Sequence, residues 1–333
     1  MNRTLPPELA VLGPCTGRVE GNGDTAVVVY RPAADGLDVA QWATEHRPQL
    51  MDALATYGAV LVRGVVHEAA LLNEVAGRIG GELLTYNERS TPRTQVSGNV
   101  YTSTEYPSAQ TIVQHNESAY SDGYPLWLFF ASTVAAETGG ETPLADSRAV
   151  ARRLPSSLVA RFRVKGVLYT RAYREGMGLT WQESYQTEDR AKVEEYCRSH
   201  GIEWTWTEDG LRTRHRRPAL ITDPRTGEES WFNQAHLFHA SNLPKETREA
   251  LEEMFDPEDM PRGAYYGDGT PIPDEELDLV RQAFEDSAYA FPWVEGDLLM
   301  VNNLLVSHGR RPYTGKRTTL VAMAGTDTAT HEH

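Results

Sequence analysis

Residues 296–323 read GDLLMVNNLLVSHGRRPYTGKRTTLVAM, and this stretch decides the fold that the sequence predicts. An apolar run follows Asp297 and reaches His308, and the turn residues PYTG separate it from a second run, RTTLVAM. Apolar and β-branched runs separated by Pro and Gly are typical of strands joined by turns. We therefore expect one long strand ending near His308, and a returning strand that brings Arg317 back beside this histidine.

The rest of the chain places further strands before a long middle region of mixed character. Strands are expected at 23–32, 59–66, 111–117 and 126–134, and helices at 39–58, 67–81, 146–164, 187–201, 245–255 and 274–291. A hairpin is expected at 203–220, with Asp209-Gly210 at its turn. Strands early, a helical and hairpin insert over about residues 150–290, and strands late indicate one interrupted β core in a single domain over residues 1–333. The polar end, from about residue 325 to 333, is expected to be a flexible tail.

Composition excludes several classes of protein. A net charge of −15 repels a phosphate backbone, so nucleic acid is not expected as a partner. The apolar runs are too short to cross a membrane, and the first residues contain no apolar segment of the kind found in secretion signals. Cys15 and Cys197 form no CxxC pair, which favours a cytoplasmic protein. The helices of the 245–290 region leave an oligomer possible.

The stretch VQHNESAY, residues 113–120, carries the first candidate metal ligands. Residues two apart in a strand share a face, so His115 and Glu117 are expected to point the same way. Such a pair also arises by chance, and a surface histidine near a turn is the simpler reading of it alone. His308 adds a third ligand. Two histidines and a carboxylate form the facial arrangement of non-heme Fe(II) oxygenases, although the same set can hold Zn²⁺.

Three more polar residues fit a site that holds an oxo acid on the metal. The guanidinium of Arg317 could bind a carboxylate with two parallel hydrogen bonds. Arg310, two residues after His308, could face the same side and reach a substrate. Thr142 follows the glycine pair in ETGGETPLADSRAV, and its hydroxyl could bond a carboxylate, although a glycine turn before a helix explains this stretch equally well.

The loop GNVYTSTEYPSAQ runs directly into the strand of His115, so its residues are candidates for contacts with substrate. The candidates are Tyr101, Thr102, Ser103 and Thr104, each of which could equally be an ordinary strand or turn residue. His236 and His239 have no acidic companion, and core or hydrogen-bonded roles are favoured for them. Trp293 is expected to pack beneath the strand of His308.

Together these motifs resemble the taurine dioxygenase and clavaminate synthase superfamily of Fe(II)- and 2-oxoglutarate-dependent oxygenases. The resemblance covers most of the chain and is closest to the branch of the syringomycin-biosynthesis hydroxylase. It implies a double-stranded β-helix, or jelly roll, with surrounding helices. It also implies Fe(II) on His115, Glu117 and His308, with 2-oxoglutarate on Arg317 and Thr142, and O2 as the third reactant. Halogenating members replace the carboxylate ligand with a small residue, so Glu117 argues against halogenation.

The activity implied by the resemblance is hydroxylation of an unactivated C–H bond, with release of succinate and CO2. The implied substrate is an amino acid or an intermediate of natural product biosynthesis, either free or bound to a carrier protein. Desaturation, cyclisation or epimerisation could occur at the same site. A non-catalytic module that binds a metal or a small molecule, and a zinc hydrolase, are the alternatives from other classes. The acidic surface disfavours an acidic carrier protein, because like charges slow association.

Overall fold

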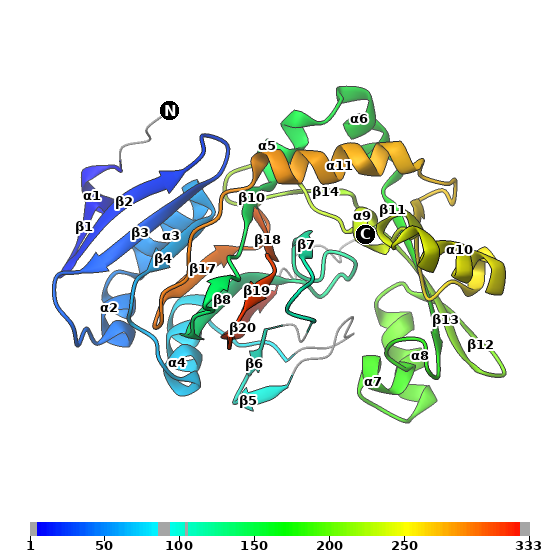
Figure 1. The fold of residues 1–333 in the computed structure, drawn as a ribbon, viewed down its shortest axis with the longest axis horizontal. Coiled ribbons are helices and arrows are strands. Elements are labelled where there is room, and N and C mark those ends of the chain that lie inside the picture. The colour runs from blue at the N-terminus through cyan, green and yellow to red at the C-terminus, as the bar shows by residue number, and fades with distance from the viewer. Residues whose placement is uncertain (1–4, 86–93, 104–105, 327–333) are drawn as a thin grey trace.

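The computed structural model describes residues 5–85, 94–103 and 106–326, and Figure 1 shows their arrangement. A nine-stranded sheet forms the centre of the molecule. Its strands are, in spatial order, β1 (Val11–Leu12), β2 (Cys15–Gly21), β3 (Ala26–Pro32), β4 (Ala59–Val62), β17 (Leu298–Asn302), β8 (Pro125–Val134), β20 (Thr318–Thr326), β6 (Val100–Thr102) and β5 (Gln95–Ser97). Neighbouring strands are antiparallel except for β3 and β4.

A second, three-stranded sheet packs against one face of the first. It consists of β10 (Leu144–Asp146), β18 (Val306–Arg310) and β7 (Ile112–His115). Side chains of the two sheets share one apolar cluster, to which Leu299 and Val321 contribute from the large sheet, and Leu144 and Val306 from the small one. Two facing sheets with helices around them confirm the predicted fold class, a mainly β core with surrounding helices.

Helices cover the other face of the large sheet. They are α2 (Val39–Glu45), α3 (Arg47–Tyr57) and α4 (Ala69–Gly80), and the short α1 (Pro7–Ala10) lies beside β1. Trp42, Leu54 and Leu72 of these helices pack against Phe129 and Met300 of the sheet. Because the central strands are buried on both faces, β17 reads LLMV without polar alternation.

The helix expected at 39–58 is two helices, and proline causes the break. Helix α2 ends at Glu45, and α3 begins at Arg47 with Pro48 in its first turn. Proline has no N–H to donate, and its ring collides with the carbonyl four residues earlier, so one continuous helix cannot pass through this position. Gly58 ends α3 as expected, with a left-handed φ of 79°.

The single long strand expected to end near His308 is also two strands, and this correction matters for the site. Strand β17 ends at Asn302 in the large sheet, and β18 begins at Val306 in the small one. Asn302 closes the turn between them, because its carbonyl accepts from the Leu305 N–H at 3.1 Å and its side chain accepts from the Leu304 N–H at 3.1 Å. Apolar residues on both sides of the asparagine pair made the run read as one strand, since both strands are buried.

The middle of the chain builds a four-stranded sheet. Its strands are, in order, β12 (Glu203–Trp206), β13 (Gly210–Arg217), β11 (Val167–Arg174) and β16 (Arg262–Tyr266). The expected hairpin is confirmed, because β12 and β13 pair up to Trp206 and Leu211 on either side of the Asp209-Gly210 turn. Strand β11, which lies between β13 and β16 in this sheet, was not predicted from the sequence. The helices α5 (Ser147–Arg153), α6 (Ser156–Lys165), α9 (Ala235–Phe238) and α11 (Asp274–Ser287) share an apolar cluster with β11 and β16.

The remaining elements lie at the periphery. They are α7 (Trp181–Tyr185), α8 (Arg190–Ser199), α10 (Lys245–Met254), the 3₁₀ turns η1 (Ala240–Asn242) and η2 (Pro257–Asp259), and the strand pairs β14 (Leu220–Thr222) with β15 (Glu229–Trp231) and β9 (Thr138–Gly139) with β19 (Tyr313–Thr314). Residues 325 and 326 belong to β20, and the rest of the expected tail lies outside the described residues. Across the described part of the chain, no helix combines the length and the apolar character needed to cross a membrane. The division into one domain with an insert stays a prediction.

The buried His215 of β13 leads to a prediction about acid stability. Burial, aided by the nearby Arg217 cation, lowers the pKa of His215 from 6.5 to about 3. As the pH falls below 6.5, His215 therefore becomes protonated in the unfolded chain while it stays neutral in the folded protein. The free energy of unfolding decreases as a result. We expect His215→Gln to make the unfolding free energy less steep in pH by up to about 1.4 kcal/mol per pH unit. Urea unfolding of the metal-free protein across roughly pH 4 to 6.5 measures this slope, and equal slopes in both proteins would contradict the prediction.

Candidate metal centre

His115, Glu117 and His308 meet at one point between the two sheets. His115 ends β7 and pairs in register with His308 of β18, and their ring centroids are 4.5 Å apart. Glu117 Oε2 lies 3.8 Å from His115 Nε2 and 3.6 Å from His308 Nε2. Fold topology alone unites these residues, since nearly two hundred positions separate the two histidines.

Glu117 reaches this point from a turn and not from a strand face. Strand β7 ends at His115, and Ser118 has a φ of 54°, in the left-handed region. The expectation that a shared strand face aligns His115 with Glu117 is therefore wrong, although the two side chains do converge. A turn directs the carboxylate back toward both imidazoles.

The donor atoms fit a divalent metal. One ligand atom from each of the three residues lies within 4.8 Å of the others, and no other group of His, Cys, Asp and Glu in the described ranges meets this criterion. His115 Nδ1 donates to the Val113 carbonyl at 2.8 Å, which leaves Nε2 to bind a metal. Two imidazoles and one carboxylate suit Fe(II) and leave coordination positions open for other ligands.

Asn303, in the turn between β17 and β18, fixes the backbone of Glu117. Its side-chain oxygen accepts from the Glu117 N–H at 2.7 Å, and its Nδ2 donates to the carbonyls of Glu117 at 3.0 Å and Pro125 at 2.8 Å. Asn116 Nδ2 donates in return to the Asn303 carbonyl at 2.7 Å. Sequence reasoning missed Asn303, although a pair of asparagines inside a buried apolar run is a signal that such groups have partners.

Residues of the middle region support β7 from the other side. His236 Nε2 donates to the Gln114 carbonyl at 2.9 Å, and Gln234 Nε2 donates to the Asn116 carbonyl at 2.7 Å. Burial lowers the pKa of His236 to about 3, so its imidazole is neutral. His239 Nδ1 accepts from the Ser241 N–H at 3.1 Å. The hydrogen-bonded roles expected for His236 and His239 are confirmed.

Arg317 extends into the same cavity as the two histidines. His115, Thr142, His308 and Arg317 all line this cavity. Arg317 Nε donates to the Gly140 carbonyl at 3.1 Å, and no ion pair within the described part of the chain involves its guanidinium. Burial lowers the pKa of Arg317 to about 10, which leaves it charged at neutral pH. A cation that is partly buried without a carboxylate partner destabilises the fold, and an anionic ligand would offset that cost.

Two hydroxyl groups lie beside Arg317. Thr142 is 4 % exposed, and its Oγ1 accepts a hydrogen bond from Trp293 Nε1 at 3.1 Å. Thr319 is also 4 % exposed, and its Oγ1 has no hydrogen-bond partner among the described residues. Thr319 was missed in the sequence, although its position two residues after Arg317 in a strand is a usable signal. The sequence contains no local signal for the contact between Trp293 and Thr142.

The expected substrate residues lie in different environments. Ser103 lines the cavity, and its N–H donates to the Thr319 carbonyl at 2.8 Å. Tyr101 packs in the cluster between the sheets, and Thr102 Oγ1 accepts from the Thr94 N–H at 3.0 Å. Thr104 lies outside the described residues. The substrate roles of these residues stay predictions.

Arg310 lines the cavity, but its guanidinium already has hydrogen-bond partners. Nη1 donates to the Tyr106 carbonyl at 3.0 Å, and Nη2 donates to those of Pro107 at 2.7 Å and Gln110 at 3.0 Å. These bonds tie the loop before β7 to β18. The predicted contact of Arg310 with a substrate would have to use the remaining N–H donors of its guanidinium.

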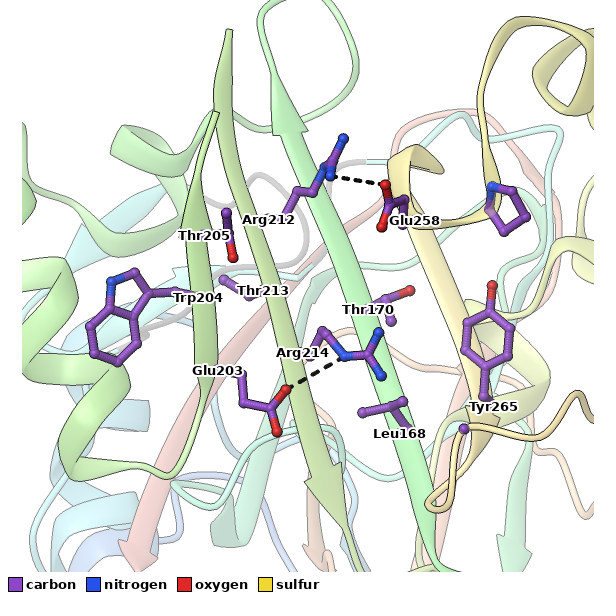
Figure 2. Close-up of a pocket in the computed structure, with 12 residues that line it drawn as sticks. Leu168, Thr170, Glu203, Trp204, Thr205, Arg212, Thr213, Arg214, Glu258 and Tyr265 are labelled. Atoms are coloured by element: carbon purple, nitrogen blue, oxygen red, sulfur yellow. Dashed lines mark hydrogen bonds and ion pairs between the residues drawn. The ribbon is translucent and has the colours of Figure 1, made fainter. Parts of the chain in front are cut away.

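A second cavity, of about 330 Å³, lies on the outer face of the four-stranded sheet (Figure 2). Its charged side chains are paired with each other, because Arg212 lies 3.2 Å from Glu258 and Arg214 lies 3.6 Å from Glu203. None of the residues that line it belongs to the metal centre. The cavity that contains His115 and His308 is therefore the candidate for the reaction site.

Comparison with known proteins assigns this chain to a family. The family model of the taurine catabolism dioxygenase TauD, TfdA family matches residues 26–323. The dapdiamide synthesis protein DdaC of Enterobacter agglomerans is 42% identical over 280 residues, which cover 84% of this chain and 85% of the relative. A clavaminate synthase-like protein of Arabidopsis thaliana is 31% identical over 278 residues, which cover 80% and 81%.

Solved structures confirm the jelly-roll fold. PvcB of Pseudomonas aeruginosa, described as an Fe, alpha-ketoglutarate dependent oxygenase from an isonitrile synthetic pathway, superimposes with a TM-score of 0.57. The match covers 97% of this chain and 94% of PvcB at 15% identity. A putative alpha-ketoglutarate dependent 2,4-D dioxygenase of Burkholderia xenovorans gives a TM-score of 0.53 at 17% identity, with 93% and 97% covered.

The position of Asn303 predicts an effect on metal affinity. In Asn303→Asp an oxygen would replace the Nδ2 donor and face the carbonyls of Glu117 and Pro125. We expect the dissociation constant for Fe(II) to rise about 10- to 100-fold, as is usual when support of a metal ligand is lost. Calorimetric titration under argon measures it, with Asn242→Asp as the control, because Asn242 Nδ2 also donates to a carbonyl, that of Leu237. Unchanged affinity with a lower melting temperature would mean that Asn303 supports only the fold.

Proposed function

Because this chain belongs to the taurine catabolism dioxygenase TauD, TfdA family, we propose that His115, Glu117 and His308 hold the metal of a non-heme Fe(II)- and 2-oxoglutarate-dependent dioxygenase. The enzyme class follows from the family. The proposal adds the assignment of the three ligands. It is supported by the convergence of their donor atoms and by the hydrogen bond that fixes the His115 tautomer.

Arg317 and Thr142 are proposed to bind 2-oxoglutarate at its second carboxylate. The observation that carries this proposal is a partly buried cation, without a carboxylate ion-pair partner among the described residues, in the same cavity as the proposed metal ligands. The guanidinium can donate two parallel hydrogen bonds to a carboxylate, and Thr142 can add a third. Bound Fe(II) supplies the redox chemistry with O2 and the oxo acid. The protein residues bind and orient the reactants and keep the site apolar.

The cavity wall supports these separate roles of the metal and the protein, because part of it is apolar. The ring of Phe130 lies 5.1 Å from that of His308, and Ile112 lines the same cavity. Apolar side chains beside a metal exclude water and strengthen the electrostatic interaction between Arg317 and a bound anion. No side chain has to act as a nucleophile, because positioning of the reacting groups is the protein's contribution.

We propose hydroxylation of an amino acid or of an amino-acid-derived intermediate in natural product biosynthesis as the reaction. The overall balance is one substrate C–H, one O2 and one 2-oxoglutarate giving one C–OH, one succinate and one CO2. DdaC is a dapdiamide synthesis protein and PvcB belongs to an isonitrile synthetic pathway, and both support a biosynthetic substrate. Whether that substrate is free or carried by a protein is a question for the purified enzyme.

The proposed ligands predict a spectroscopic signature. Anaerobic protein mixed with Fe(II) and 2-oxoglutarate should give the weak visible band of a keto-acid chelate to ferrous iron. His115→Ala should abolish the band, and Arg317→Ala should raise the dissociation constant for 2-oxoglutarate about 10- to 100-fold through the loss of charge-assisted hydrogen bonds.

Arg311→Ala is a matched control, because Arg311 lies on the surface and lies 3.4 Å from Glu285. Folded protein that gives no band and binds no 2-oxoglutarate would reject the assignment. Tight binding of Zn²⁺ with hydrolytic activity would then favour the zinc hydrolase, and binding without turnover would favour the non-catalytic module.

The reaction type predicts the fate of molecular oxygen. With ¹⁸O2, hydroxylation should place one labelled oxygen atom in the product and one in succinate. Mass spectrometry of both compounds measures this. A product that has lost two hydrogen atoms, or is unchanged in mass while succinate forms, would instead identify desaturation, cyclisation or epimerisation at the same site.

A further inference from the structure

The hydrogen bond between Trp293 and Thr142 sets the direction in which the threonine can donate. Trp293 Nε1 lies 3.1 Å from Thr142 Oγ1, and an indole N–H is a donor only. Thr142 Oγ1 must therefore accept this bond. The single hydroxyl hydrogen of Thr142 is then left for another acceptor, and Thr142 is 4 % exposed, so bulk water is a poor candidate.

Trp293 is itself held firmly by a buried ion pair. Arg63 Nη1 lies 2.5 Å from Asp297 Oδ2 and donates to the Pro292 carbonyl at 3.0 Å, and Asp297 Oδ2 accepts from the Val294 N–H at 2.8 Å. These bonds fix the backbone on both sides of Trp293. Its ring also packs edge-on against Phe291, with centroids 5.3 Å apart. The indole donor is therefore pre-organised and does not have to be ordered when a ligand binds.

The Thr142 hydroxyl shares its cavity with the guanidinium of Arg317. Arg317, which lines the same cavity, is a donor only, and its Nε already serves the Gly140 carbonyl. A Cβ on Gly140, which has a φ of +74°, would lie 3.0 Å from Arg317 Cδ, so glycine lets the guanidinium chain pass close to this turn. A cation and a hydroxyl with a hydrogen to donate, lining one cavity, could together bind the oxygens of one carboxylate.

We propose that Trp293 is a positioning residue that commits the Thr142 hydroxyl to donate to the second carboxylate of the oxo acid. This rests on the proposed binding of 2-oxoglutarate and deepens it, because it explains how the site prefers an oxo diacid to an oxo monoacid of equal length. Without the indole N–H, one constraint on the rotation of the hydroxyl is lost, so its hydrogen can point away from the ligand. Part of its donation to the ligand is then lost.

The test compares two ligands on protein loaded with Fe(II) under argon. 2-Oxoglutarate and 2-oxopentanoate both chelate a metal through the 1-carboxylate and the keto oxygen, and only the first has a second carboxylate. The dissociation constant of each is measured by titrating the visible band for the wild type, Trp293→Phe, Thr142→Val and the double variant. Trp206→Phe is the control, because Trp206 Nε1 also donates a hydrogen bond, to Glu194, outside the cavity.

We expect Thr142→Val to weaken 2-oxoglutarate binding about 10-fold and Trp293→Phe to weaken it about 3- to 10-fold, the range for hydrogen bonds to a charged group and between neutral groups. The double variant should be no weaker than Thr142→Val alone, since the indole acts through the hydroxyl. Affinity for 2-oxopentanoate should be unchanged in all of them, because it has no group for Thr142.

Two results would overturn the inference. Equal weakening of both ligands by Trp293→Phe would show a general loosening of the site, and additive losses in the double variant would show that Trp293 acts independently of Thr142. Failure of the wild type to bind 2-oxoglutarate is a separate outcome, which rejects the proposed co-substrate site itself.

Discussion

One crossing of the chain between two facing sheets positions two of the three proposed metal ligands, Glu117 and His308. Strand β17 leaves the large sheet at Asn302 and β18 enters the small sheet at Val306, and the turn between them carries Asn303. The amide of Asn303 satisfies both backbone groups of Glu117. The same few residues therefore place His308 opposite His115 and direct the carboxylate toward both. A buried turn needs such partners, because its backbone groups have no access to water.

The metal centre is supported from both sides. Asn303 holds the turn of Glu117 from the side of the jelly roll, and Gln234 and His236 hold the carbonyls beside His115 from the side of the middle region. All of these bonds are made to backbone atoms, which leaves the ligand side chains to the metal. Support of this kind limits the motion of the proposed ligands.

Two polar residues that line the cavity, Arg317 and Thr319, lower the stability of the fold. Arg317 is a partly buried cation without an ion-pair partner among the described residues, and Thr319 is a buried hydroxyl without a hydrogen bond among them. Burying such groups destabilises a fold unless a ligand completes them. The ion pair of Arg63 and Asp297, which holds the loop of Trp293, keeps this arrangement rigid. A protein can tolerate the unfavourable burial of polar side chains at a site where they are needed to bind a ligand.

The sequence alone determined the fold class, most helices, some of the strands and the residue types of the proposed metal set, because these follow from periodicity, turn residues and ligand chemistry along the chain. Tertiary structure decided what local patterns do not encode. The asparagine pair at residues 302 and 303 does not by itself show that the chain changes sheets there, and Glu117 reaches the histidines from a turn. Arg310 gives its donors to a loop, and Trp293 bonds to Thr142. Each of these depends on hydrogen bonds between residues far apart in the sequence, which form only when the sheets come together.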